Sequence, residues 1–541
     1  MSESASRPRA AIHEYGYQLI FLALLAGFLV YGWSFIQRTA FEIDGARVYA
    51  LFDDAMVSMQ YAKNLANGDG LVWNAGGERV EGYSNPLWVL LMAGIHLFPI
   101  PLTMTSLYVK LGNLLILLLN LVVVKQITEQ FTSNRLLPIL AAALAAFYFP
   151  LNNWSLQGME VGFIALLLSG AVLLDLNSLA ARRFSPWPYL LLAAAVLTRM
   201  DAVVLLISFG AIMAWLDGSQ RRRHLAWGLG SLLIPIAALT AFRLAYYGAW
   251  LPNTYALKLG GISTILRVSL GLRLLADFLW QSNWILFALP FLLLALGKDR
   301  RLMLLFGVIL AQMAYSVYVG GDSWEHVGGA NRFIASVMPL FFVLFTLTMG
   351  KLLDLAMEAL EARPNWGSAA GQAALVLLTA LSLFNFNTLQ VQDSVQRWTL
   401  IKKPVFTESV ERYAEMGIRL GQLTTPDAVI AVITAGNIPY FSERTSIDVL
   451  GKNDPVIAGG PARINSSLFQ PGDFRPGHNK WDYAYSIGEL QPDVVAQFWE
   501  NTETEVAPYL VDYEIYVVNG IPYYFRTDSE KILWDQLPPQ N

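Results

Sequence analysis

The sequence predicts an α-helical polytopic membrane protein with a C-terminal α/β domain. Hydrophobic residues make up 55% of the chain and charged residues 14%, whereas soluble proteins carry about a quarter charged residues. Long apolar stretches recur up to residue 390, and helices are the open-ended structures that satisfy their own backbone polar groups in a bilayer. From residue 391 on, acidic residues outnumber basic residues 20 to 12. We therefore divide the chain into a membrane domain, 1–390, and a soluble domain, 391–541.

The first apolar stretch, 17–36, is 20 residues long. It is longer than the apolar core of a typical signal peptide, and no clear Ala-x-Ala site follows it closely. We interpret it as an uncleaved membrane anchor. Arg7 and Arg9 precede it and favour a cytoplasmic N-terminus.

Ten further apolar stretches bring the prediction to eleven spans. They lie near 105–124, 135–150, 159–178, 187–200, 202–216, 224–246, 283–296, 302–319, 334–349 and 368–390. Short basic loops alternate with them at positions that the positive-inside rule assigns to the cytoplasm. Residues 86–98 are apolar too, but a helix of this length reaches only about 20 Å, short of a hydrocarbon core of roughly 30 Å. We expect an interfacial or re-entrant helix there. We expect the soluble domain and the loops 37–104 and 246–282 on the extracytoplasmic side of the membrane.

The soluble domain contains clear strand and turn signals. Residues 429–434 follow a turn at Pro426 and are typical of a buried strand. The runs 511–518 and 521–526 flank Asn519-Gly520, a pair that favours the type I′ turn of a β-hairpin. Pro522 lacks an amide N–H, so we expect the second strand of this hairpin at a sheet edge. The chain has no cysteine, which excludes disulfides and thiolate metal sites.

Two adjacent carboxylates, Asp53 and Asp54, follow the first span in the outer loop. Carboxylates at the membrane surface suit acid/base chemistry. Neighbouring side chains on a helix diverge by about 100°, so the two cannot both face one substrate atom. We expect one to be a general base and the other to cap the following helix, and we favour Asp53 as the base. The alternative is that both only stabilise the first turn of that helix.

Three more charged residues lie at the predicted outer face. Glu160 begins an apolar helix and is a third candidate catalytic residue. Alternatively, its negative charge only stabilises that helix by interacting with the positive end of the helix dipole. Arg199 and Asp201 separate two short spans, and we expect them to form a structural ion pair.

Taken in order, segments across most of the chain resemble the GT-C superfamily of membrane glycosyltransferases. Within it they are most similar to bacterial terminal arabinofuranosyltransferases of the mycobacterial cell-wall and pilin-modifying types. The segments that carry the resemblance are Asp53-Asp54, Gly-Tyr-Ser-Asn-Pro-Leu-Trp at 82–88, Gly-Met-Glu at 158–160, and residues 247–254, 320–322, 332–333, 448–455 and 476–480.

The resemblance implies a GT-C fold and a glycosyltransferase that moves D-arabinofuranose from a polyprenyl-phosphate donor to a periplasmic acceptor hydroxyl. The acceptor would be a glycan or a pilin-type protein, and an Asp of the first outer loop would be the general base. Cations must then stabilise the leaving phosphate, although a lone outer Lys or Arg is also ordinary surface. The candidate phosphate ligands are Lys258, Arg332, His326, His478 and Lys480. The candidates for the acceptor site or cavity wall are Tyr83, Asn85, Trp88, Asn253, Tyr255 and Asp322. Residues 442–454 form either a loop over this cavity or an ordinary connection between strands.

Two alternatives stay open: a GT-C transferase of another sugar such as mannose or aminoarabinose, and a flippase or transporter of lipid-linked sugars. A transporter typically shows charges near the middle of the bilayer or paired repeats, and the sequence shows neither pattern. It also has no Gly-x-x-x-x-Gly-Lys-Ser/Thr loop for ATP and no clear Asp-x-Asp motif for a nucleotide sugar. We expect no cofactor, no metal site (with a divalent cation as the alternative) and no nucleic-acid partner. The expected location is the bacterial inner membrane, with the soluble domain in the periplasm.

Overall fold

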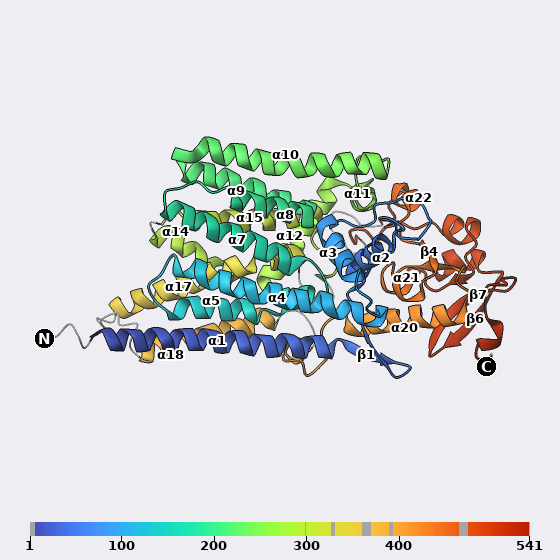
Figure 1. Ribbon diagram of the computed structural model, residues 1–541, viewed down its shortest axis with the longest axis horizontal. Coiled ribbons are helices and arrows are strands. Elements are labelled where there is room, and N and C mark those ends of the chain that lie inside the picture. Colours follow the sequence, from blue (N-terminus) through green and yellow to red (C-terminus); the bar gives the residue numbers. More distant parts are fainter. Residues whose placement is uncertain are drawn as a thin grey trace.

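The computed structural model describes residues 6–297, 299–325, 331–359, 369–388, 393–464 and 474–539. Figure 1 shows long helices lying side by side along the longest axis of the molecule, with the mixed α/β domain at the end opposite the N-terminus. The predicted fold class, a helical membrane protein with a C-terminal sheet-containing domain, is confirmed.

Seven described helices are long and apolar enough to cross a membrane. They are α1 (Ser6–Arg38), α4 (Leu102–Glu129), α7 (Val161–Ala180), α10 (Arg221–Tyr246), α15 (Leu302–Val319), α17 (Met338–Ala359) and α18 (Ala369–Asn387). Two bent pairs raise the count to nine if each is one span. The first is α5 (Leu136–Ala146) with α6 (Phe149–Leu156), and the second is α12 (Thr264–Gln281) with α13 (Trp284–Ala288) and α14 (Leu292–Leu296).

The predicted count of eleven spans is therefore too high for the described residues. It included α8 (Trp187–Thr198) and α9 (Val203–Leu216) as separate spans. A helix of 12 residues rises about 18 Å, less than the thickness of a hydrocarbon core. Helix α3 (Pro86–His96) is too short as well, as predicted, and it packs against α2 (Asp53–Asn67).

The segment expected as an outer loop, 246–282, is mostly helical. It forms α11 (Asn253–Leu259) and α12, and α12 packs against α15. Hydropathy missed α12 because charged residues interrupt its apolar ones: Arg267, Arg273 and Asp277 lie among Leu266, Leu270 and Phe278.

The C-terminal domain contains helix α20 (Thr407–Leu423) and a five-stranded sheet in the order β4-β3-β5-β7-β6. Strands β4 (Thr445–Asp448), β3 (Val429–Val432) and β5 (Val494–Val495) are parallel. Strands β6 (Tyr513–Val518) and β7 (Ile521–Arg526) form the predicted antiparallel hairpin, with positive φ angles of 51° at Asn519 and 76° at Gly520.

The prediction that Pro522 marks an edge strand is wrong, because β7 lies between β5 and β6. Strand β5 has only two residues, which pair with Tyr524 and Phe525. It ends before reaching Pro522, so the missing N–H of Pro522 interrupts no hydrogen bond on that side of β7.

The C-terminal domain packs on the segment between α1 and α4. The indole N–H of Trp73 donates to the carbonyl of Ala435 at 2.9 Å, and the Asn74 side chain bonds both backbone groups of Ser446 on β4. The loop between β1 (Ala40–Ile43) and β2 (Ala46–Tyr49) carries Asp44, whose carboxylate pairs with Arg419 of α20 at 2.7 Å. These contacts place α2 at the junction of the two domains (Figure 1).

Candidate active site

Asp53 and Asp54 occupy the first turn of α2, and their side chains point in different directions. Both charges lie in the first turn, where they suit the positive end of α2, but the hydrogen bonds of their carboxylates go to other segments of the chain. Asp53 contacts the C-terminal domain, and Asp54 faces a group of cations. The divergence follows from the 100° turn per residue of an α-helix.

Both carboxylate oxygens of Asp53 accept hydrogen bonds from the start of α21 (Asn437–Ser442). The backbone N–H groups of Gly436 and Asn437 donate at 3.2 and 2.8 Å, and the Asn437 amide donates at 3.1 Å. A Cβ on Gly436 would collide with the Asp53 carbonyl, so this close approach requires glycine. Burial raises the pKa of Asp53 to about 6, although its hydrogen bonds to Asn437 lower it. Asp53 thus ties α21 to α2.

Asp54 forms two ion pairs, one with a cation of each domain. Arg332 Nη1 lies 2.9 Å from one carboxylate oxygen, and Lys452 Nζ lies 2.8 Å from the other. Burial alone would raise the pKa of Asp54, but Lys452, Arg332 and Lys258 together hold this pKa well below its ordinary value. Asp54 is therefore ionised at neutral pH, with 28% of its side chain still exposed.

Lys452 comes from the loop after β4, within the segment 442–454 that the sequence offered as a cover for the cavity. The carboxylate of Asp448 accepts hydrogen bonds from the backbone N–H groups of Leu450, Gly451 and Asn453, at 2.8 to 3.1 Å, and from the Asn453 amide at 2.9 Å. This network fixes the loop backbone, which projects Lys452 towards Asp54. The loop does reach the cavity, although the sequence did not single out Lys452.

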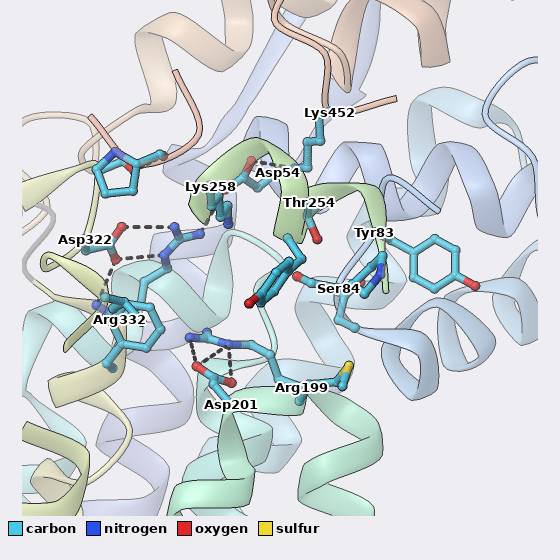
Figure 2. Close-up of a pocket in the computed structure, with 18 of the residues that line it drawn as sticks. Asp54, Tyr83, Ser84, Arg199, Asp201, Thr254, Lys258, Asp322, Arg332 and Lys452 are labelled. Atoms are coloured by element: carbon cyan, nitrogen blue, oxygen red, sulfur yellow. Dashed lines mark hydrogen bonds and ion pairs between the residues drawn. The ribbon is translucent and has the colours of Figure 1, made fainter. Parts of the chain in front are cut away.

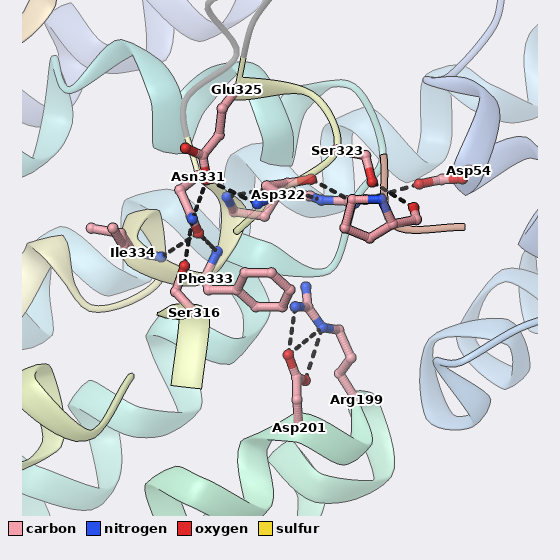
Figure 3. Close-up of polar contacts among 12 residues, drawn as sticks. Asp54, Arg199, Asp201, Ser316, Asp322, Ser323, Glu325, Asn331, Phe333 and Ile334 are labelled. Atoms are coloured by element: carbon pink, nitrogen blue, oxygen red, sulfur yellow. Dashed lines mark hydrogen bonds and ion pairs between the residues drawn. The ribbon is translucent and has the colours of Figure 1, made fainter. Parts of the chain in front are cut away.

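Arg332 is held in place by Asp322. Figure 3 shows Asp322 among the polar contacts after α15. The guanidinium donates to both Asp322 oxygens at 2.8 and 2.9 Å, and the Arg332 backbone N–H also donates to Asp322 at 3.0 Å. Asn331 caps α16 (Arg332–Ala335) through the N–H groups of Phe333 and Ile334. This arrangement leaves the Nη1 group of Arg332 directed at Asp54.

A cavity of about 350 Å³ lies between the helix ends and the C-terminal domain (Figure 2). Of the residues predicted from sequence, it is lined by Asp54, Tyr83, Asn85, Glu160, Tyr255, Lys258, Asp322 and Arg332. Lys258 on α11 lies beside Asp54 and Arg332. Burial lowers the pKa of Lys258 to about 8, while Asp54 pulls it upward.

Glu160 is the N-cap residue of α7, but its side chain makes no capping bond. It pairs instead with Arg199 at 3.3 Å and accepts a hydrogen bond from the Asn85 amide at 3.2 Å. Arg199 also pairs with Asp201 at 2.6 Å, as predicted, and its guanidinium lies over the ring of Phe333. Glu160 and Asp201 thus neutralise an arginine in the cavity wall.

A second cavity, of about 460 Å³, opens on the other side of Asp54. The two cavities share seven lining residues: Asp54, Val57, Lys258, Ser323, Arg332, Lys452 and Pro476. The second cavity extends along α20 and the loops of the C-terminal domain, where it is also lined by Asp53 and His478. Burial lowers the pKa of His478 to about 4, so this imidazole is neutral at pH 7.

Three residues selected from sequence have structural contacts and line neither cavity. The Trp88 indole donates to the carbonyl of Gly158 at 2.9 Å, and the Asn253 amide donates to the carbonyls of Gly451, Lys452 and Asp454. Lys480 donates to the carbonyls of Ala256 and Ala458 at 3.0 and 2.6 Å. Asn253 and Lys480 therefore join α11 to the C-terminal domain. His326 lies outside the described residues.

The arrangement combines one ionised carboxylate with cations that can bind an anionic group. Among the described residues, no group of three His, Cys, Asp or Glu side chains is placed to hold a metal ion. Asp54 lies where two cavities meet, so a group in either cavity can reach it. Such a site can remove a proton from a ligand in one cavity while cations stabilise negative charge in the other.

Comparison with known proteins reveals a shared fold. A family described as "Domain of unknown function (DUF8728)" matches residues 403–524, and no curated protein matches the sequence. The apo structure of ArnT from Cupriavidus metallidurans is 13% identical, with a TM-score of 0.53 over 98% of this chain and 100% of that one. The oligosaccharyltransferase AglB from Archaeoglobus fulgidus, solved with an inhibitory peptide and a dolichol-phosphate, is 13% identical, with a TM-score of 0.51 over 98% of this chain and 75% of that one. Identities this low show the fold alone: this chain shares the GT-C fold with these two proteins.

Proposed function

We propose that this protein is a glycosyltransferase that moves a sugar from a polyprenyl-phosphate donor to an acceptor hydroxyl. The observation that carries the proposal is the position of Asp54, at the junction of two cavities and beside three cations, Lys258, Arg332 and Lys452. The solved AglB complex contains a dolichol-phosphate and a peptide in a protein of the same fold, which supports a lipid-phosphate donor here.

In the proposed reaction, the donor phosphate binds among these cations and the sugar lies next to Asp54. The Asp54 carboxylate takes the proton of the acceptor hydroxyl, and the acceptor oxygen forms a bond to the anomeric carbon. The bond from that carbon to the phosphate oxygen breaks, and its electron pair leaves with the lipid phosphate. Direct displacement inverts the anomeric configuration, and the three cations stabilise the charge that develops on the phosphate.

We favour Asp54 over Asp53 as the base for two reasons. Both Asp53 oxygens are engaged by the start of α21, whereas Asp54 lines both cavities. The low pKa of Asp54 comes from the same cations that would bind the phosphate. An incoming phosphate offsets their charge, which raises the pKa of Asp54 and makes it a stronger base when the donor is present.

The finer identity of the substrates rests on the sequence resemblance. It favours D-arabinofuranose as the sugar, transfer of single residues, and a glycan or pilin-type protein as the acceptor. It also favours the bacterial inner membrane, with the C-terminal domain in the periplasm. Mannose and aminoarabinose are the alternative sugars, and translocation of the lipid-linked sugar is the alternative function.

A donor panel tests the proposal. Purified protein in nanodiscs is given radiolabelled polyprenyl-phosphate arabinofuranose, or the mannose or aminoarabinose analogue, together with membrane-derived acceptors. We expect one donor to give a labelled product with inverted anomeric configuration. Vesicles containing the protein are assayed in parallel for movement of the labelled donor between leaflets. Translocation of the labelled donor without a product from any donor would contradict the proposed transferase and indicate a transporter.

The alkaline limb of the pH profile should depend on Lys258. Its ammonium is charged below a pKa of about 8 and neutral above it, so kcat/KM for the donor should fall as the pH rises through about 8. Lys258→Arg should remove this limb because a guanidinium stays charged, and Lys258→Met should lower kcat/KM at every pH. Lys402→Arg, at a half-exposed site outside both cavities, is the control. An unchanged limb in Lys258→Arg would contradict the assignment.

A further inference from the structure

The second cavity lies at the carboxyl ends of the three parallel strands of the C-terminal domain. Its wall includes Ile433, Thr434 and Ala435 after β3, Leu450 and Lys452 after β4, and the run from Ala496 to Glu500 after β5. In parallel sheets, ligands bind preferentially at this edge, because the loops that leave the strands converge there. The position of the cavity therefore marks it as a binding site of the C-terminal domain.

The wall of this cavity is rich in aromatic rings and arginines. Trp324, Phe406, Tyr413, Trp499 and Tyr524 line it. The guanidinium of Arg475 lies over the ring of Trp499, with 5.9 Å between its central carbon and the ring centroid. Arg412, an exposed residue of α20, also lines the cavity.

This composition suits a carbohydrate. A sugar ring has an apolar face of C–H groups that packs on an aromatic ring, and hydroxyls around its edge that accept hydrogen bonds from guanidinium groups. Binding sites typically combine apolar and aromatic walls with a few polar groups that fix the orientation of the ligand.

An extended peptide has less support in this domain. Peptides commonly bind by adding a strand to an exposed sheet edge. The edge strand β4 is covered by the membrane domain, because Asn74 bonds both the N–H and the carbonyl of Ser446, at 3.0 and 2.8 Å. The opposite edge is β6, which is separated from the parallel strands by β7.

We propose that the second cavity is the acceptor site and that the acceptor is a glycan whose sugar rings pack against Trp499 and its aromatic neighbours. This inference rests on the proposed function, because it takes the transferase reaction as given and assigns the acceptor. The seven residues shared by the two cavities provide a continuous path, so a hydroxyl of a glycan in the second cavity reaches Asp54. The domain of unknown function would then be an acceptor-binding module.

The test uses the full-length protein and two sets of defined acceptors. The first set is short synthetic arabinosides and mannosides of three to five sugars, and the second is Ser- and Thr-containing peptides of similar mass. We expect transfer to oligosaccharides and none to peptides. Trp499→Ala should raise KM for the oligosaccharide about tenfold, the loss expected when a ring contact worth about 1.4 kcal/mol is removed, and should leave KM for the donor within twofold. Arg412→Ala, at an exposed site that tolerates substitution, should raise KM for the oligosaccharide in the same direction.

Trp481→Ala is the matched control. Its ring lies 6.3 Å from that of Trp499 but does not line the cavity, so both KM values should stay at the wild-type level. Transfer to peptides instead of oligosaccharides would overturn the acceptor class. Unchanged oligosaccharide KM in both Trp499→Ala and Arg412→Ala would overturn the acceptor site. Each of these outcomes requires that the wild-type protein consumes a donor. If the wild-type protein consumes no donor at all, the result contradicts the proposed function itself.

Discussion

Replacing Asp54 with asparagine should lower the rate of transfer by about 10²- to 10⁴-fold, the contribution typical of a general base. Asparagine keeps the size of the side chain but cannot accept the proton of the acceptor hydroxyl. It also removes the charge that Arg332 and Lys452 pair with, so the donor phosphate should bind no more weakly and KM for the donor should not rise. Single-turnover assays with saturating donor measure the chemical step directly.

Asp53→Asn provides the contrast within the same turn of α2. An asparagine at position 53 offers one acceptor oxygen where the carboxylate offers two to Gly436 and Asn437. We therefore expect faster proteolysis of the C-terminal domain and a loss of activity smaller than that of Asp54→Asn. The sequence favoured Asp53 as the base, so the relative sizes of the two losses decide between the carboxylates.

Asp69→Asn is the control for both variants, because Asp69 is exposed just beyond the other end of α2. It should retain wild-type activity and resistance to proteolysis. Full activity in Asp54→Asn, with Asp53→Asn inactive but folded, would return the role of base to Asp53.

Glu81→Gln should lower the free energy of unfolding by about 3–5 kcal/mol, the typical result of removing one partner of a buried ion pair. Glu81 lies between α2 and α3 and Arg243 near the end of α10, and their side chains are 5% and 1% exposed. The guanidinium donates to the two Glu81 oxygens at 2.6 and 2.9 Å. Without the carboxylate, Arg243 would keep a buried charge with no anion to balance it.

A double-mutant cycle separates this cost from the value of the pair. Burial raises the pKa of Glu81 even though Arg243 pulls it down, so the desolvation of the carboxylate is only partly offset. Glu81→Gln/Arg243→Met should therefore recover most of the stability lost in Glu81→Gln. Thermal unfolding in detergent is the measurement, and Glu78→Gln, an exposed position in the same loop, is the control. A double variant as unstable as the single one would show that the unpaired charge is not the cause.

The features that the sequence predicted well depend on local interactions. Long apolar runs marked α1, α4 and α7, since a membrane span is a property of its own composition. The β6–β7 hairpin followed from Asn519-Gly520, because the conformation of a two-residue turn depends on the residues in it. The same local reading missed α12, because Arg267, Arg273 and Asp277 interrupt the apolar residues of this helix, which packs against α15.

The residues of the candidate site show how far a site can be predicted from the sequence alone. The sequence places two carboxylates after the first span and shows that they must diverge, but it does not show which one lies where the two cavities meet. That choice depends on the docking of α21, which occupies Asp53. The Lys452–Asp54 pair joins residues 398 positions apart. No local pattern encodes such a contact, because it forms only when the C-terminal domain packs on the segment between α1 and α4.

The sequence by itself thus determined the class of fold, most of the membrane helices and the pool of charged residues available at one face. Only the tertiary structure decided which of them meet, and so which carboxylate lies between two cavities with cations from both domains beside it. The physical reason is that helices and turns form from the properties of neighbouring residues, whereas an ion pair in a cavity depends on how distant segments pack.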